Sequence, residues 1–483
     1  MKLKLLFLLV FFVLLAFVSC TEAGGGCDDD DCSEPSSSSV GNPSGGNSSL
    51  GGGNGNSSSS GGDVGNSSSG GSDNGNSSSG GNGNSSNLWT GWPFDNSDEN
   101  LSASPSCPSY DEAIEIAYSN GADAQIPNDP SVTKEGENVT VTLSGTTERH
   151  ILLSGTARNG SLKIYGGDSR VVLHLNGLNI KNNSGPAINV QKGKRVTVCL
   201  VSGKENYLDG TSATPQGQEQ AKGAFFSEEK LYFTGNGSLD VKSRQGHAIV
   251  VDNDFEINNG KLTISESEGD GIHVNDKIEI LGGVIKIASK GDAIQSEKPG
   301  SAVYPSVTIS GGKILAQTTG IKSHGITSEG LIRIEENAIV QISVLGNGSK
   351  GIKSTKDTEI LGGTIKIQVS GGRDQNSNAD TSNAAGIKVG VNGDGIDAVK
   401  ADLFIDGGNI TIKSPGSSAK GINVSRNIDM RRGNVNIEAN DDGIKVHGAL
   451  KMSGGTISVE SMRGPEYDID GAVDQTGGTI NGK

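Results

Sequence analysis

The sequence contains few aromatic residues, cysteines or histidines. Phe, Trp and Tyr together make up 4% of the 483 residues, and there are five cysteines and six histidines. The cysteines and histidines show none of the spacings typical of zinc sites, and the histidines form no recognisable catalytic triad. A phosphate-binding loop and a dinucleotide fingerprint are also missing. These absences argue against zinc-dependent, triad-dependent and nucleotide-dependent chemistry.

Basic residues are outnumbered by acidic ones. The chain has 40 Lys and Arg against 56 Asp and Glu, which gives a formal net charge of -16. Nucleic-acid binding needs a basic face that neutralises phosphates, so we expect no nucleic-acid partner. An acidic balance suits hard cations such as calcium, although solvation of the surface explains the charge equally well.

The apolar run at residues 5–18 is too short to span a bilayer. Lys2 and Lys4 precede it and Ser19-Cys20 follows it, which is the pattern of a signal peptide. Residues 17–20 resemble a bacterial lipobox, although Phe17 stands where the motif usually has Leu. We predict a lipoprotein signal peptide over residues 1–20 with a lipidated Cys20. The exported protein would be anchored to the cell membrane or the outer membrane and exposed at the surface.

Residues 21–88 consist mostly of Ser, Gly and Asn. Such a segment cannot bury enough apolar surface to offset the entropy lost on ordering, so we predict a disordered tether. Within it Cys27 and Cys32 bracket an acidic run, whereas Cys107 and Cys199 lie far apart in the sequence. Because exported proteins meet an oxidising compartment, we expect disulfides between Cys27 and Cys32 and between Cys107 and Cys199.

Residues 89–130 gather Trp89, Trp92, Phe94 and Tyr110 just before a repetitive region. A solenoid must cover its open end, so we interpret this segment as an N-terminal cap. A platform on which sugars stack is the alternative.

Residues 131–483 repeat with a period of about 22 residues, as the steps from Ile249 to Ile272 and Ile294 show. One unit holds three short alternating strands: the first follows Asp270-Gly271, and Gly282-Gly283 separates the other two. Glycine pairs recur at Gly311-Gly312, Gly362-Gly363, Gly407-Gly408, Gly454-Gly455 and Gly477-Gly478. Three strands per unit of this period predict an all-β fold, a right-handed parallel β-helix of roughly a dozen coils.

The order of motifs resembles a known family. It consists of the segments at 196–200, 202–206 and 224–227, followed by the Asp-Gly-Ile and Gly-Gly coils. This order is similar to that of the Clostridium-type carbohydrate-binding β-helix family. The resemblance covers residues 132–483 and implies a secreted pectate-lyase-like β-helix with calcium sites that binds cellulose and polygalacturonate. Lys350 and Lys420 stand where other coils carry Asp before Gly-Ile, which departs from the common pattern.

Charged residues collect in the turns that lead into each Gly-Ile. Asp270 and Asp292 are 22 residues apart and should stack on neighbouring coils, where calcium could bridge them and recruit Glu268. A tight Asp-Gly turn explains each aspartate singly. A second candidate calcium group, which assumes that residues 467–470 form a turn, comprises Asp394, Asp441, Asp442, Asp468 and Asp470. Lys420 lies between two coils of this group and could replace the cation by a salt bridge.

Lysines and one tyrosine in the same turns are candidates for contact with a ligand. Lys290, Lys350 and Lys420 could meet carboxylates, and Tyr467 could stack on a sugar. We therefore predict a monomer that binds an acidic, pectin-type or cell-wall polysaccharide at the bacterial surface with the help of calcium and without catalysis.

Two alternatives remain open. A calcium-dependent pectate lyase would need a base such as Arg373 or Arg463, and neither sits in a catalytic motif. A structural or adhesive surface protein would need no sugar specificity. We assign no catalytic residue.

Overall fold

The computed structural model describes residues 93–94, 106–213, 219–297, 306–376, 383–390 and 399–482. The predicted signal peptide, Cys20, the tether, Cys27, Cys32 and Asp394 lie outside these residues.

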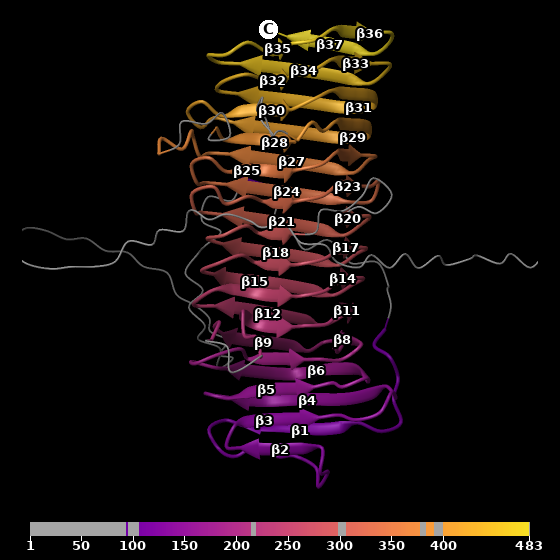
Figure 1. Ribbon diagram of the computed structural model, residues 1–483, viewed down its shortest axis with the longest axis vertical. Coiled ribbons are helices and arrows are strands. Elements are labelled where there is room, and N and C mark those ends of the chain that lie inside the picture. The colour runs from indigo at the N-terminus through magenta and orange to yellow at the C-terminus, as the bar shows by residue number, and fades with distance from the viewer. Residues whose placement is uncertain are drawn as a thin grey trace, which may run out of the picture. The chain divides into compact units, whose positions relative to one another are not determined.

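The described part of the chain is a parallel β-helix of about 13 turns, and it contains no helix (Figure 1). The strands stack from β2 at one end to β36 and β37 at the other. Most coils contribute one strand to a 14-stranded sheet and two strands to a 23-stranded sheet, whereas four coils contribute a single long strand to the larger sheet. No described helix could cross a membrane.

The 14-stranded sheet forms the first face of the β-helix. All neighbours in it pair in parallel except β2 and β3, which form an antiparallel pair at its first edge. Its strands are β2 (Val132–Glu135), β3 (Asn138–Thr142), β5 (Ser161–Tyr165), β7 (Ile188–Gln191), β10 (Gly223–Ser227), β13 (His247–Val251), β16 (Ile272–Val274), β19 (Ile294–Ser296), β22 (Ile326–Ser328), β25 (Lys350–Ser354), β28 (Ala385–Val389), β30 (Lys420–Val424), β32 (Ile444–Val446) and β35 (Tyr467–Ile469).

The 23-stranded sheet bends around the second and third faces. Four long strands pass through the corner between them: β4 (Arg149–Ala157), β6 (Arg170–Lys181), β29 (Leu403–Ser414) and β31 (Ile428–Ala439). The second face has β1 (Ile114–Ser119), β8 (Arg195–Leu200), β11 (Leu231–Gly235), β14 (Phe255–Ile257), β17 (Ile278–Ile280), β20 (Val307–Ile309), β23 (Ile332–Ile334), β26 (Thr358–Ile360), β33 (Leu450–Met452) and β36 (Val473–Gln475). The third face has β9 (Glu205–Gly210), β12 (Ser238–Ser243), β15 (Lys261–Ser267), β18 (Val284–Ser289), β21 (Lys313–Thr318), β24 (Ile339–Val344), β27 (Thr364–Val369), β34 (Thr456–Ser461) and β37 (Thr479–Gly482).

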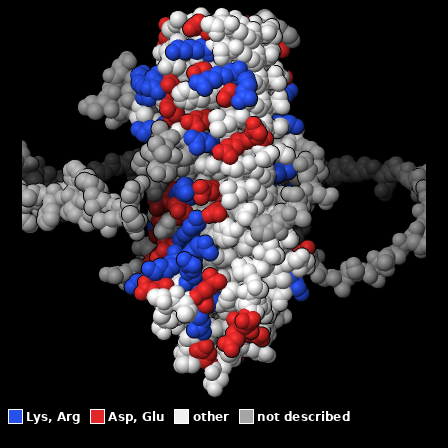
Figure 2. All heavy atoms as spheres, turned by 90° about the vertical axis from the view of Figure 1, so that its right-hand side faces the viewer, with Lys and Arg blue, Asp and Glu red and all other residues white. Residues whose placement is uncertain are grey.

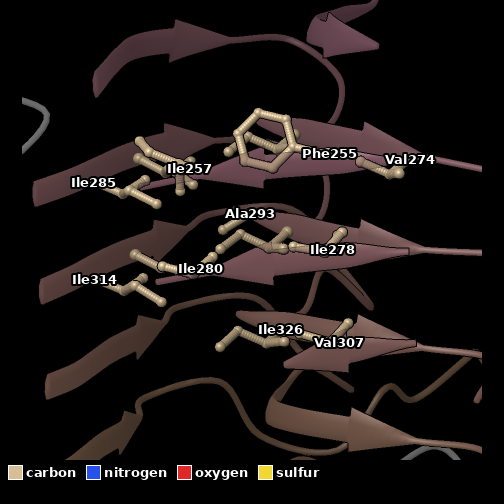
Figure 3. Packing of buried hydrophobic residues seen from close by; sticks show 14 of the residues in the cluster. Phe255, Ile257, Val274, Ile278, Ile280, Ile285, Ala293, Val307, Ile314 and Ile326 are labelled. Atoms are coloured by element: carbon tan, nitrogen blue, oxygen red, sulfur yellow. The ribbon is translucent and has the colours of Figure 1, made fainter. Parts of the chain in front are cut away.

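The register of the strands builds the core as ladders of identical positions. Ile249, Ile272 and Ile294 are direct partners on β13, β16 and β19, as the repeat period predicts. Two further ladders follow the same rule, one through Ile278 and Val307 and the other through Ile285 and Ile314. Figure 3 shows the side chains of the last two ladders, Ile278 with Val307 and Ile285 with Ile314, stacked in layers in the core. Since all of them are fully buried, each coil covers the apolar surface of its neighbours.

The glycine pairs form the corner between the second and third faces. Gly312 and Gly363 have φ of +77° and +82°, which favours glycine over any residue with a side chain. A Cβ on Gly363 would lie 2.6 Å from the carbonyl oxygen of Ala338 on the preceding coil. The pairs recur because both the backbone angle and the close stacking of coils require them.

Residues of the predicted cap add a strand to the first coil. Strand β1 pairs in parallel with β4 and buries Ile114, Ile116 and Tyr118 against the core. Just before β1, Cys107 forms a disulfide with Cys199 of β8, with a Cα–Cα distance of 5.3 Å. The Tyr110 ring lies 4.5 Å from that of His174.

Thr358 places a hydroxyl group in one of the apolar ladders of the core. It lies between Ile332 and Leu403, is fully buried, and its hydroxyl has no hydrogen-bond partner among the described residues. Replacing it by the isosteric Val removes an unsatisfied polar group, so Thr358→Val should stabilise the fold by about 1 kcal/mol. A raised thermal midpoint of the purified chain would show this. Thr308→Val, on the outward side of β20, is the matched control and should change little. An unchanged or lowered midpoint for Thr358→Val would contradict the prediction.

Candidate functional site

A row of polar side chains runs along the edge where the chain enters the 14-stranded sheet. We call it the polar ladder. Backbone hydrogen bonds between successive coils place its members at equivalent positions: His247, Asp270, Asp292, His324, Lys350, Lys420 and Asp442. Asp270 and Asp292 therefore occupy neighbouring coils, as their spacing predicts.

Five consecutive members of the polar ladder are linked by four hydrogen bonds from backbone to side chain. The N–H of Asp270 donates to His247 Nδ1 at 3.0 Å, and the N–H of Asp292 donates to Asp270 Oδ1 at 2.7 Å. In the next coils, the backbone N–H of His324 donates to Asp292 Oδ1 at 2.5 Å, and the backbone N–H of Lys350 donates to His324 Nδ1 at 3.0 Å. The series ends at Lys350 because an ammonium group has no acceptor. Each acceptor side chain thus satisfies a buried N–H of the following coil.

The two stacked aspartates have opposite pKa shifts. Burial raises the pKa of Asp270, but its hydrogen bonds and charge contacts with His247 and His273 outweigh burial, so this pKa lies well below its usual range. For Asp292, burial and the nearby Asp270 charge prevail over the His324 N–H and raise the pKa to about 7. Asp270 is therefore ionised at neutral pH, whereas Asp292 is partly protonated.

The first predicted calcium group is not assembled as expected. Glu268 pairs with Lys290 at 2.6 Å instead of joining the two aspartates. The carboxylate oxygens of Asp270 contact the Asp292 N–H and the Nδ1 atoms of His247 and His273. Because calcium prefers six to eight oxygen ligands, this nitrogen-rich surrounding does not fit it.

Lysines and a histidine occupy the second predicted calcium group. Lys420 is almost fully buried and binds both Asp441, at 3.0 Å, and Asp442. Burial lowers the pKa of Lys420, but the two carboxylates outweigh burial and raise it. Lys420 thus forms the salt bridge that the sequence allowed in place of a bound cation.

The remaining acids of that group lie apart from Lys420. Asp470 contacts His447 Nδ1 at 2.8 Å, and Asp468 pairs with Lys445. The prediction that residues 467–470 form a turn is wrong. Tyr467 begins strand β35 opposite Ile444, because it continues the inward ladder, and its hydroxyl donates to the Asn481 carbonyl at 2.7 Å.

A polar hollow opens beside the C-terminal half of the polar ladder. It has a volume of about 620 Å³ and is lined by turns of three successive coils: Asn347, Ser370, Gly372, Arg373, Gln375, Ser417 and Ser418. Arg373 was one of the two arginines considered for a lyase, and it lies here. At its margin Lys350 is buried and donates to the Gly348 carbonyl at 2.7 Å. Burial and the charges of Lys353 and Lys322 lower the pKa of Lys350 to about 8.

Lysines also occupy the outward side of the 14-stranded sheet. Lys353 of β25 lies directly opposite Lys388 of β28. Lys388 is almost fully buried, and its Nζ donates to Asn423 Oδ1 at 3.1 Å. By contrast, Figure 2 shows acidic and basic side chains mixed over another side of the β-helix. On the second face, for example, Arg333 pairs with Glu359 at 2.7 Å.

The histidines of this edge were not among the site residues predicted from the sequence. His247, His273 and His324 all form hydrogen bonds with members of the polar ladder. His247 and His324 stand two residues before an inward isoleucine, the same offset as Asp270, and this shared offset was the available signal. A further group of Cys107, His174 and Cys199 converges near the cap, but its cysteines form the disulfide.

A family model of carbohydrate-binding domain-containing proteins matches residues 135–392 and 387–468, more than half of the chain. The chain belongs to this family. Its β-helix is accordingly a carbohydrate-binding domain, and its partner is a polysaccharide. No curated protein matches this chain.

Among solved structures, the chain is similar to a polysaccharide lyase-like protein from C. thermocellum, determined as a gadolinium derivative. The two share 17% identity, and the alignment covers 76% of this chain and all of that chain, with a TM-score of 0.28.

The raised pKa of Asp292 predicts how stability depends on pH. A carboxyl group whose pKa is higher in the folded than in the unfolded state stabilises the fold at low pH, and that contribution is lost as pH rises through the folded-state value. The wild-type thermal midpoint should therefore fall between about pH 4 and pH 7, and Asp292→Asn should reduce the fall. Asp429→Asn, at an exposed ion pair, is the control. Parallel curves for wild type and Asp292→Asn would contradict the assignment.

Proposed function

We propose that the β-helix binds an acidic polysaccharide of pectin or cell-wall type without cleaving it. The observation that carries the proposal is the pair of lysines, Lys353 and Lys388, that face each other on adjacent strands. Like charges directly opposite each other in a sheet are destabilising, and Lys353 forms no ion pair with any described residue. Lys353 is the more exposed of the two lysines, because Lys388 is almost fully buried. A carboxylate of a uronate chain bound at Lys353 would offset the repulsion and gain a charge-assisted hydrogen bond.

The polar hollow supplies a second kind of contact on the same coils. Its lining of serine, asparagine, glutamine and arginine side chains offers donors and acceptors suited to sugar hydroxyls. Asn347 lies in the turn that leads into β25, the strand that carries Lys353. A polysaccharide that spans several coils would therefore meet both the hollow and the lysine pair.

Calcium enters this proposal as an ion that arrives with the polysaccharide. The described carboxylates of both predicted groups are engaged by histidine, lysine or backbone groups, so they form no all-oxygen site ready for the ion. Calcium would then act by bridging uronate carboxylates to an exposed acid, and its contribution would depend on its concentration.

Export and lipidation at Cys20 would place the binding domain at the bacterial surface. The predicted tether would let the domain search for a polysaccharide at some distance from the membrane.

Removing the charge of Lys353 should weaken polysaccharide binding. In calorimetric titration of the purified chain with polygalacturonate oligomers, Lys353→Met should bind about tenfold more weakly, because one charge-assisted contact is lost. Lys353→Arg should restore most of the affinity, and Lys451→Met, an exposed lysine on β33, should leave it unchanged.

The same titration separates the alternatives. Repeating it with excess chelator measures the share due to calcium, and new absorbance of unsaturated uronate would reveal a lyase. Heat with a neutral glycan but none with polygalacturonate would overturn the acidic specificity. Absence of heat with any soluble glycan would favour a structural or adhesive protein.

The predicted anchor has its own test. Cells that express the chain and are fed a labelled fatty acid should label the protein, and Cys20→Ala should lose the label. Equal labelling of the two forms would rule out lipidation at Cys20.

A further inference from the structure

Two histidines and one aspartate converge on the outer side of the polar ladder, at β13 and β16. His273 Nδ1 lies 2.8 Å and His247 Nδ1 lies 3.1 Å from the same oxygen, Oδ2 of Asp270. One ligand atom from each of the three residues lies within 4.8 Å of the others. We propose that His247, Asp270 and His273 form a binding site for a divalent transition-metal ion of the zinc type.

The kind of ligand selects the metal. Two imidazole nitrogens and one carboxylate oxygen suit zinc and its transition-metal neighbours, whereas calcium and magnesium prefer oxygen alone. Three protein ligands would leave a position for water or for a ligand oxygen. The site thus differs in chemistry from the calcium groups expected from the sequence, although it shares Asp270 with one of them.

His247 brings one ring nitrogen close to both the backbone and the carboxylate of Asp270. The N–H of Asp270 lies 3.0 Å from His247 Nδ1, and the same nitrogen lies 3.1 Å from Asp270 Oδ2. A metal ion bound to both atoms would be attracted by the lone pair of the nitrogen and by the negative charge of the carboxylate.

Glu297 occupies the place of a supporting residue. Its Oε1 lies 3.3 Å from Nε2 of His273, the nitrogen opposite the proposed metal ligand. Metal-binding histidines usually donate this second N–H to a carboxylate, which fixes the tautomer that leaves Nδ1 free for the metal. Glu297 and Asp270 thus hold the His273 ring between them.

The site is rigid and open to solvent. Its residues are the first residue of β13, the turn before β16 and the centre of β16, all held by the register of the 14-stranded sheet. The His247 side chain is 32% exposed, against 12% for Asp270, so an ion could enter from the His247 side. Binding would cost the hydrogen bond from the Asp270 N–H, about 1 kcal/mol, which is small beside the free energy of zinc coordination.

The test uses zinc alone and needs no polysaccharide, so its outcome is independent of the proposed function. The purified chain should bind one zinc ion in equilibrium dialysis with metal analysis, and zinc should raise the thermal midpoint. His273→Gln and Asp270→Asn should abolish both effects. Glu297→Gln should weaken zinc binding about 10- to 100-fold without removing it.

Controls separate this site from other ligands in the chain. His447→Gln, which alters another histidine–aspartate contact of the same sheet, should bind zinc as the wild type does. Unchanged thermal midpoints of the variants without zinc would show that they fold, and Asp270→Asn keeps an oxygen for the Asp292 N–H. Zinc binding that is equal in wild type and His273→Gln, or calcium that competes on equal terms, would overturn the proposal.

Discussion

Stacking of each coil on the next, in register and at the spacing of hydrogen-bonded strands, fixes where every described side chain lies. Ile249, Ile272 and Ile294 share one inward position because their strands are direct partners. The burial of such ladders supplies most of the stabilising free energy, and it leaves no freedom for a coil to shift by one residue without turning apolar side chains outward. The packing of the core therefore also determines which polar side chains lie next to each other at the edges.

The polar ladder shows how the chain adapts to that constraint. The carboxylates of Asp270 and Asp292 would repel each other if both were ionised and unpartnered. Instead Asp270 is held ionised by two histidines, and the raised pKa of Asp292 lets it carry a proton. Farther along, Lys420 balances Asp441 and Asp442. At Lys353 and Lys388 the register brings like charges together, and the proposed acidic ligand would bind at Lys353.

The repeat period predicts the coils, the three strands in each and the corners at the glycine pairs, because all depend on residues that recur at fixed spacing. It also predicts that Asp270 and Asp292 are neighbours. It does not predict the partners of their oxygens, since these depend on how each turn bends. Tyr467 was predicted to lie in a turn because it is aromatic, whereas the nearest preceding coils carry Ile at this inward position. It is the strand partner of Ile444. The cluster of His247 and His273 needs both the register and the turn geometry.

The series of hydrogen bonds from His247 to Lys350 separates coils with short connections from coils with long ones, which matters for protein engineering. Within that series the connections into the 14-stranded sheet are short, because an acceptor side chain must reach the N–H of the next coil. Connections lengthen on either side of it, at 211–222 and 370–384. The central coils therefore form a scaffold with short connections, and the two longer connections are the places where loops of new specificity could be grafted without breaking these hydrogen bonds.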